Sequence, residues 1–247
     1  MAISKTRANY MTWVDVIISD DDTNRKVTSA QLQDNIIPDA VEEFSGDVPR
    51  IAVQNFTGTG DFFITLPTST LPWERGFSQV LRVFYPFVST DQIPTEVDRR
   101  DWYIEEIPDT DAGVLERLRF KADSPSSAQT VRVTYSMRHT LSGTVNTIPD
   151  SYFNAVVQLI CAHYYMALAG VDSHTRDSTI GADVVDYNEQ ESKYGRRSME
   201  HRKEYWRLIG KKIVGGEPIP RAGGSFINLD AFDSHGRDRI HHRAAWR

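Results

Sequence analysis

Apolar residues near the start of the chain recur at helical spacing. Residues 8–19 hold a short apolar run that fits either a helix or a strand. Thr28 and Gln31 then stand three residues apart, which is the spacing of a capping box at a helix start. The apolar positions that follow lie on one face of a helix: Leu32, Ile36, Ile37, Ala40, Val41 and Phe44. Pro38 falls inside this pattern, so we expect it to kink or divide the helix.

From residue 50 to about residue 141 the apolar period changes to two. Short runs rich in Val, Ile, Phe, Tyr and Thr alternate with polar segments that contain Gly, Pro, Ser and Asp. The runs are residues 51–56, 61–67, 77–86, 101–108, 114–121 and 129–141. This spacing predicts an antiparallel sheet or a small sandwich of about six strands. In the last run, Val131, Val133 and Tyr135 are expected to share one face of the sheet.

Helical spacing returns after residue 147. Pro149 and Asp150 are favourable residues at a helix start, and Gly170 is a favourable stop. The apolar stripe between them comprises Phe153, Val156, Val157, Ile160, Tyr164 and Leu168. Because residues 153–169 are almost free of charge, we expect this helix to be buried on most sides.

A second helix of about 25 residues is predicted within residues 177–212. Residues at intervals of three, four and seven mark one face: Tyr187, Tyr194, Ser198, His201, Tyr205 and Leu208. Acidic residues crowd its first half: Asp183, Asp186, Glu189 and Glu191. Basic residues crowd its second half: Arg196, Arg197, Arg202, Lys203 and Arg207. This order of charges complements the helix dipole, and each well-placed charge stabilises the helix by about 0.3–1 kcal/mol. It is typical of a well-formed surface helix.

After Gly210 the periodic pattern ends. Residues 211–247 contain two Gly-Gly pairs and too few apolar residues to form a core of their own. We expect an extended arm that becomes ordered only against a partner. The candidate binding residues of this arm are Arg221, Phe226, Ile227, Leu229, Phe232, Arg237, Arg239, Ile240, His241, His242, Arg243, Trp246 and Arg247.

Together the patterns predict an α+β fold: a helical-bundle core with an inserted antiparallel β-sheet or sandwich and an extended C-terminal arm. The expected units are residues 1–48 (first helices of the core), 49–145 (β-rich insertion), 146–210 (two-helix part of the core) and 211–247 (arm). The residues expected to form the helical core are Leu32, Ile36, Val41, Phe44, Phe153, Val156, Val157, Ile160, Tyr164, Leu168, Tyr187, Tyr194, Tyr205 and Leu208.

The composition is that of an ordinary globular protein, with 40% hydrophobic and 25% charged residues among 247. No run approaches the roughly 18 consecutive apolar residues of a membrane span, and the N-terminus has no cleavable signal pattern. A single cysteine, Cys161, excludes internal disulfides and a cysteine zinc site. We therefore expect synthesis and folding in a reducing cytoplasm.

Charge is distributed unevenly along the chain, whose net charge is −6. Residues 192–247 hold 13 Lys or Arg against 6 Asp or Glu, which is +7, and the remainder holds 15 against 28, which is −13. Such an acidic body with a basic C-terminal quarter often marks an interaction tail.

One loop approaches the spacing of a calcium site. Asp20, Asp22 and Asn24 stand at the first ligand positions of a calcium loop. Arg25 occupies the position that requires glycine, and Gln31 occupies that of the bidentate glutamate. A capped loop before the first predicted helix explains these residues better.

No catalytic pattern stands out elsewhere. His241 and His242 together with His235 could bind a metal, but adjacent histidines near a chain end more often face solvent or a partner. Cys161 lies within the apolar stripe of a predicted helix, where a nucleophile would be inaccessible. Glu105 and Glu106 point to opposite faces of a strand and cannot act as an acid–base pair. We expect no enzymatic activity, no metal site and no cofactor.

Several stretches taken together resemble one protein family. They are residues 27–50, 73–86, 101–104 and 131–141, followed by the apolar helix in 147–169 and the Tyr-spaced polar helix in 177–210. In their order they resemble the head-tail adaptor (connector, or head completion) proteins of tailed bacteriophages. The pair of helices looks like the family's two-helix core, and the resemblance covers about residues 10–210. Pro38 departs from the family's uninterrupted first helix, and the arm and the large sheet exceed its smallest members.

The resemblance implies a structural virion protein that forms a ring, twelve-fold in the family, in the neck between capsid and tail. It implies docking under the portal ring and extension of the DNA channel toward a stopper or tail-tube protein. The implied partners are the portal, other copies of the chain and that stopper or tail protein. DNA passes through without specific binding, and no membrane is involved. The arm would bind the portal or a neighbouring copy.

Two other roles remain open at this stage. One is another neck protein, a stopper or a tail terminator. The other is a glycan- or receptor-binding virion module, in which exposed Trp73, Trp102 and Tyr103 would form a stacking platform. Burial of these aromatic residues would argue against that role. The charge reversal in 177–212 also has a second interpretation beside the helix dipole, in which its basic end faces the portal and neighbouring copies.

Overall fold

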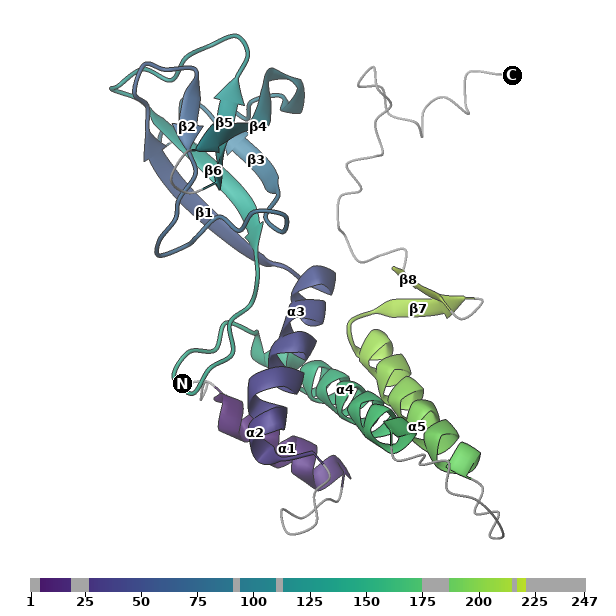
Figure 1. Cartoon of the computed structure of the whole chain (residues 1–247). Helices are drawn as coiled ribbons and strands as arrows, with labels where there is room; N and C mark the ends of the chain where they lie inside the picture. Colours follow the sequence, from purple (N-terminus) through teal and green to yellow (C-terminus); the bar gives the residue numbers. More distant parts are fainter. Residues whose placement is uncertain are drawn as a thin grey trace, which may run out of the picture.

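The computed structural model describes residues 5–18, 27–90, 94–109, 113–174, 187–214 and 217–220. Figure 1 shows a helical part and a β part joined where α3 leads into β1 and where the chain returns from β6. The elements are α1 (Arg7–Ile18), α2 (Ser29–Gln31), η1 (Leu32–Ile36), α3 (Ile37–Asp47), β1 (Arg50–Thr57), β2 (Phe63–Thr65), β3 (Val80–Phe84), η2 (Arg99–Asp101), β4 (Trp102–Asp109), β5 (Gly113–Phe120), β6 (Thr130–Met137), η3 (Asp150–Tyr152), α4 (Phe153–His174), α5 (Tyr187–Leu208), β7 (Lys211–Val214) and β8 (Glu217–Pro220). The predicted α+β class is confirmed.

The helical part is built around α4. Helices α1, α3 and α5 all contact it, and α5 runs alongside it (Figure 1). Phe153, Val156, Val157, Ile160, Tyr164 and Leu168 are all buried in this core. From α1 to α3, Tyr10, Val14, Leu32 and Phe44 are fully buried in the same cluster. The segment 8–19 fitted either a helix or a strand, and the structure has helix α1 over Arg7–Ile18, because Tyr10 and Val14, four residues apart, reach that core.

The segment Asp150–Gly170 is long and apolar enough to cross a membrane by length and composition alone. However, 61% of its apolar window is buried inside the protein. Because α1, α3 and α5 cover it, packing within the fold accounts for its apolar character.

Pro38 changes the helix without stopping it. The Thr28–Gln31 capping box is present: the backbone N–H of Gln31 donates to Oγ1 of Thr28 at 3.2 Å. The next turn is π-helical: the Ile37 N–H donates to the carbonyl oxygen of Leu32, five residues earlier. Proline lacks the N–H that a regular α-helical turn needs and would clash with the carbonyl four residues before it. The wider turn before Pro38 accommodates both effects, and the helix continues to Asp47.

The β part contains two three-stranded antiparallel sheets with strand orders β1-β6-β3 and β2-β5-β4. Each of the six strands overlaps one of the six runs predicted from the alternation of apolar residues, and none extends more than one residue beyond its run. Val131, Val133 and Tyr135 on β6 are fully buried, and they share a core with Ile64 and Leu118 of the other sheet. The helical part and the β part therefore each have a core of their own.

The start of the predicted arm differs from expectation. Residues 211–220 were expected to be extended, but β7 and β8 pair as an antiparallel hairpin directly after α5. Gly210, with φ +83°, makes the turn between α5 and β7, a backbone conformation that favours glycine. The hairpin pairs its backbone groups locally, so this stretch becomes ordered without a partner.

Three predicted core residues on α5 have different environments. Tyr205 is fully buried, and Tyr194 is half-buried against the core. Leu208 is 36% exposed, so its assignment to the core is wrong. The reason is its position in the last turn of α5, where Trp206 and Ile209 contact the core instead. The side chain of Tyr187 lies outside the described residues.

Candidate functional site

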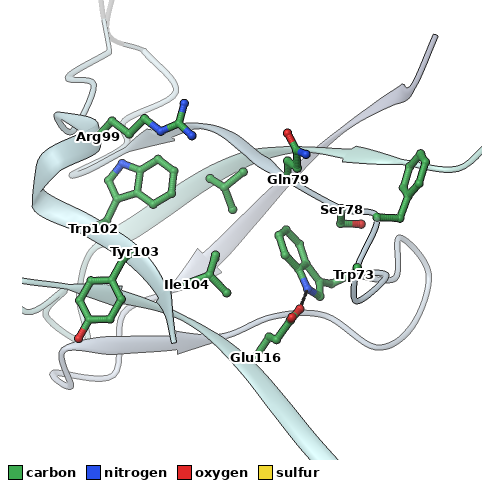
Figure 2. A pocket seen from close by; sticks show the side chains of 11 residues that line it. Trp73, Ser78, Gln79, Arg99, Trp102, Tyr103, Ile104 and Glu116 are labelled. Carbon is green, nitrogen blue, oxygen red and sulfur yellow. Dashed lines mark hydrogen bonds between the residues drawn. The ribbon is translucent and has the colours of Figure 1, made fainter. Parts of the chain in front are cut away.

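The expected aromatic platform on the β part is not an exposed surface. Trp102 is only 8% exposed, Trp73 is half-buried, and Tyr103 is 39% exposed. All three line a pocket of about 470 Å³ together with Gln79, Arg99 and Glu116. Figure 2 shows the two indole rings on different sides of this pocket rather than side by side on one plane. A flat stacking surface for sugar rings is therefore absent at these residues.

The Glu116 carboxylate in this pocket is engaged within the β part. The Glu116 side chain is 10% exposed and accepts a hydrogen bond from Nε1 of Trp73 (Figure 2). Its other oxygen lies 3.7 Å from Nε of Arg75, whose Nη2 is 3.4 Å from Glu106. These contacts join the loop before β3 to strands β4 and β5. The arrangement is structural, and it places no free acid or base opposite the carboxylate.

No metal or nucleophilic site is found among the residues that the structure describes. Within them, no group of three or more His, Cys, Asp or Glu side chains is close enough to hold a metal ion. Cys161 is fully buried in α4, and burial raises the pKa of its thiol to about 12. The thiol therefore stays protonated and unreactive at neutral pH.

His139 holds together the chain segments that join the two parts. Its backbone N–H donates to Oγ of Ser45 on α3 at 2.9 Å. Its ring nitrogens Nδ1 and Nε2 each lie 3.0 Å from a carbonyl oxygen, those of Thr147 and Val48 respectively. Burial lowers the pKa of His139, although the two carbonyl oxygens favour the protonated ring and Arg50 opposes it. One side chain thus fixes the exit of α3, the end of β6 and the approach to α4.

A second link between the two parts is made by Arg138. Its Nη2 lies 2.9 Å from Glu42 on α3, and its Nε lies 3.3 Å from Glu74 in the loop before β3. These side chains are 28–60% exposed, so each ion pair stabilises only weakly. Their effect is to orient the β part relative to α3.

The ends of α3, α5 and β7 meet in a polar cluster beside α4. Glu43 accepts hydrogen bonds from Nε2 of His163 at 2.8 Å and Nη2 of Arg202 at 2.7 Å. Burial opposes ionisation of Glu43, but the His163 hydrogen bond and the charges of Arg202, His163 and Lys211 outweigh it and lower its pKa. Sequence patterns did not reveal this cluster, because Glu43 lies 120 residues from His163 and 159 residues from Arg202 in the chain.

Two outward helix faces carry opposite charge. The α5 basic face consists of the exposed residues Lys193, Arg196, Glu200, Lys203 and Arg207. The α3 acidic face consists of the exposed residues Asp34, Asp39 and Glu42 on the helix formed by α2, η1 and α3. The sequence holds no Lys or Arg between Val27 and Pro49. The basic half of the predicted charge reversal is thus a surface of α5, whereas the side chains of its acidic half lie outside the described residues.

The predicted arm residues, from Arg221 to Arg247, all lie outside the described residues. What the structure does describe is the root of the arm. Lys211 at the start of β7 pairs with Asp47 of α3, which anchors the hairpin to the helical part.

No protein-family model matches the chain, and no curated protein matches it. Among solved structures, it is similar to a chain from the "Neck of native GTA particle computed with C12 symmetry" at 14% sequence identity. The match covers 78% of this chain and 94% of that chain, with a TM-score of 0.24. A TM-score of this size does not establish a shared fold or function.

Proposed function

We propose that this chain is a structural protein of the neck of a tailed bacteriophage or phage-like particle, and not an enzyme. In this role it forms a ring that docks under the portal and extends the DNA channel toward the tail. The observation that carries the proposal is the pairing of an apolar helix, α4, with a Tyr-spaced polar helix, α5, after an inserted β part. That order is the one in which the sequence resembles head-tail adaptor proteins.

The charge distribution supports passage of DNA without binding. The chain outside residues 192–247 carries a net charge of −13. Like charge disfavours contacts with phosphate groups, so an acidic channel wall lets DNA slide past. The acidic body suits the wall of such a channel.

The root of the arm supports a docking role for the C-terminal segment. Because Lys211 pairs with Asp47, the β7–β8 hairpin that precedes residues 221–247 in the sequence is anchored on the helical part. This segment carries five Arg and several large apolar residues. A chain of 27 residues can reach about 90 Å when extended, enough to contact the portal or the next copy.

The test is co-elution of the purified chain with the portal ring encoded in the same genome, followed by measurement of the mass of the complex. We expect about one copy per portal subunit, as the closed symmetry of such rings requires. A variant ending at Pro220 keeps the β7–β8 hairpin and is expected to remain folded by circular dichroism but to lose portal binding. Arg82→Gln, an exposed change on the β part, serves as the matched control and is expected to bind normally.

Two results contradict parts of this proposal. If the variant that ends at Pro220 still binds the portal, the arm is not part of the interface. Failure of the full chain to bind the portal in low and moderate salt, together with binding to the tail tube, assigns it to a stopper or tail-terminator role instead.

A further inference from the structure

Within the part of the chain that the structure describes, the α5 basic face has no acidic surface packed against it. It lies opposite Ser198 and Tyr205, which are buried, with Ser198 Oγ donating to the Ala162 carbonyl of α4 at 2.8 Å. Arg207 is paired with Glu204 on the same helix. Lys193, Arg196 and Lys203 form no ion pair with another described residue. Their ammonium and guanidinium groups are therefore available to an anionic surface.

The α3 acidic face is similarly unmatched. Glu42 pairs with Arg138, but Asp34 and Asp39 form no ion pair with any residue that the structure describes. The acids that face inward on α3, Glu43 and Asp47, are already neutralised by Arg202 and Lys211. On this helix, Asp34 and Asp39 are therefore the carboxylates that lack an ion-pair partner among the described residues.

The two faces cannot neutralise each other within one molecule. All of their side chains are exposed, and the hydrogen bonds found between the described residues of α3 and α5 join the inward residues Glu43, Asp47, Arg202 and Tyr205, with Lys211 of β7 also bound to Asp47. The basic face spans about 21 Å from Lys193 to Arg207, and the acidic face spans about 12 Å from Asp34 to Glu42, so the acidic face is the shorter of the two.

We propose that the α5 basic face of one copy docks against the α3 acidic face of a second copy. The contact joins two different surfaces, so it is head-to-tail and repeats from copy to copy until a ring closes. This inference rests on the proposed function, which requires a ring, and it names the two helices that make the contact.

A nucleic acid is the other polyanion that could occupy the basic face. A second copy is favoured because a single contact between copies neutralises the charge of both faces. A phosphate backbone on the basic face would leave Asp34 and Asp39 without a cationic partner. Glu200 and Glu204 also lie among the bases of α5 and would repel closely spaced phosphates. The two occupants give different results in the experiment that follows.

The experiment uses charge reversal on the full-length chain. One variant carries Asp34→Lys with Asp39→Lys, and the other carries Arg196→Glu with Lys203→Glu. Self-association is measured by sedimentation velocity over a range of concentrations, alone and in the presence of the portal ring. We expect each variant to associate at least tenfold more weakly than the unmodified chain, and an equimolar mixture of the two to recover association. The unmodified contact is expected to weaken in 1 M NaCl, where charges are screened within about 3 Å.

Folding and general charge effects are controlled separately. All four substituted residues are exposed, so circular dichroism and thermal melting are expected to be unchanged. Asp61→Lys with Asp123→Lys, on exposed positions of the β part, makes the same change in net charge as the Asp34→Lys, Asp39→Lys variant and is expected to associate normally. In a second readout, Asp39→Cys and Lys203→Cys chains are mixed with a short bismaleimide cross-linker. The mixture is expected to give a cross-linked dimer that neither chain forms alone.

Three outcomes overturn the inference. The first is full association of both charge-reversal variants, which leaves the ring and the proposed function intact but places the contact elsewhere. The second is a mixture that fails to recover association, or a chain that never associates, alone or on the portal. The third is unchanged self-association together with loss of binding to a 30-base-pair DNA duplex by the Arg196→Glu, Lys203→Glu variant. Persistent self-association without portal binding contradicts the proposed docking role instead and leaves the contact between copies standing.

Discussion

Tyr205 on α5 donates a hydrogen bond of 2.7 Å from its hydroxyl to Oδ2 of Asp47, the last residue of α3. The two residues are 158 positions apart, and Tyr205 is fully buried. Asp47 also binds Lys211 at the start of β7. A single carboxylate therefore joins the first helices of the core, the last helix and the root of the C-terminal segment.

Removing the Tyr205 hydroxyl is expected to destabilise the protein. Tyr205→Phe keeps the ring in the core but deletes a hydrogen bond to a charged acceptor, which contributes about 1.5–3 kcal/mol. Urea unfolding followed by circular dichroism measures the loss. Tyr103→Phe, at a 39% exposed tyrosine, is the control and is expected to be neutral. Equal stability of the two variants would show that the Tyr205 hydroxyl contributes nothing.

Glu43 is expected to make stability depend on pH in the acidic range. Its pKa in the folded chain lies below its ordinary value of 4.5, so folding favours its ionised form. That contribution is fully present above pH 4.5 and is lost as the pH falls through the lower, folded-state pKa. Glu43→Gln is therefore expected to be less stable than the unmodified chain at pH 7, with the difference shrinking toward pH 3. Chemical unfolding at pH 7, 5, 4 and 3 tests this, and a constant difference across that range contradicts it.

His139 is expected to stabilise the junction between the helical and β parts. His139→Ala removes the ring that lies between the carbonyl oxygens of Val48 and Thr147. The neutral ring donates to one of these two oxygens, and leaving that acceptor unpaired costs about 1–3 kcal/mol. Because the pKa of His139 is lowered in the fold, its contribution is complete above pH 6.5 and decreases as the pH falls below it. Melting curves at pH 8 and pH 5.5 are expected to differ less for His139→Ala than for the unmodified chain. Thr144→Ala, at an exposed loop position, is the control and is expected to melt like the unmodified chain at both pH values.

Gly58 is expected to tolerate no side chain. A Cβ atom at this buried position would lie 2.2 Å from the Ser126 carbonyl oxygen and 2.6 Å from that of Pro125. Both atoms belong to the backbone, so Gly58→Ala must displace the chain before β6, and we expect a loss of about 1–3 kcal/mol or more. Gly46→Ala is the matched control. It lies in α3 with nothing within 4 Å of the added Cβ, and alanine's better helix propensity is expected to stabilise by up to about 1 kcal/mol. Similar thermal midpoints for the two variants would contradict the clash.

The sequence by itself determined the identity and order of most elements. The alternation of Val131, Val133 and Tyr135 marks the buried face of β6, and the stripe from Phe153 to Leu168 marks the buried face of α4. Such patterns are local: a strand or a helix buries one side, and the spacing of apolar residues records which side it is. The capping box at Thr28 was equally readable, because both of its partners lie within four residues.

Only the tertiary structure decided which distant residues meet and which surfaces remain open. Nothing in the spacing of Asp47, Tyr205 and Lys211 indicates their contact, since it depends on how α3 and α5 pack on α4. Burial of Trp102 in a pocket, exposure of Leu208 and the β7–β8 hairpin were likewise not readable from local pattern. Periodicity reports which side of an element is apolar, whereas the energy of a contact depends on the shape and charge of whatever the fold brings against it.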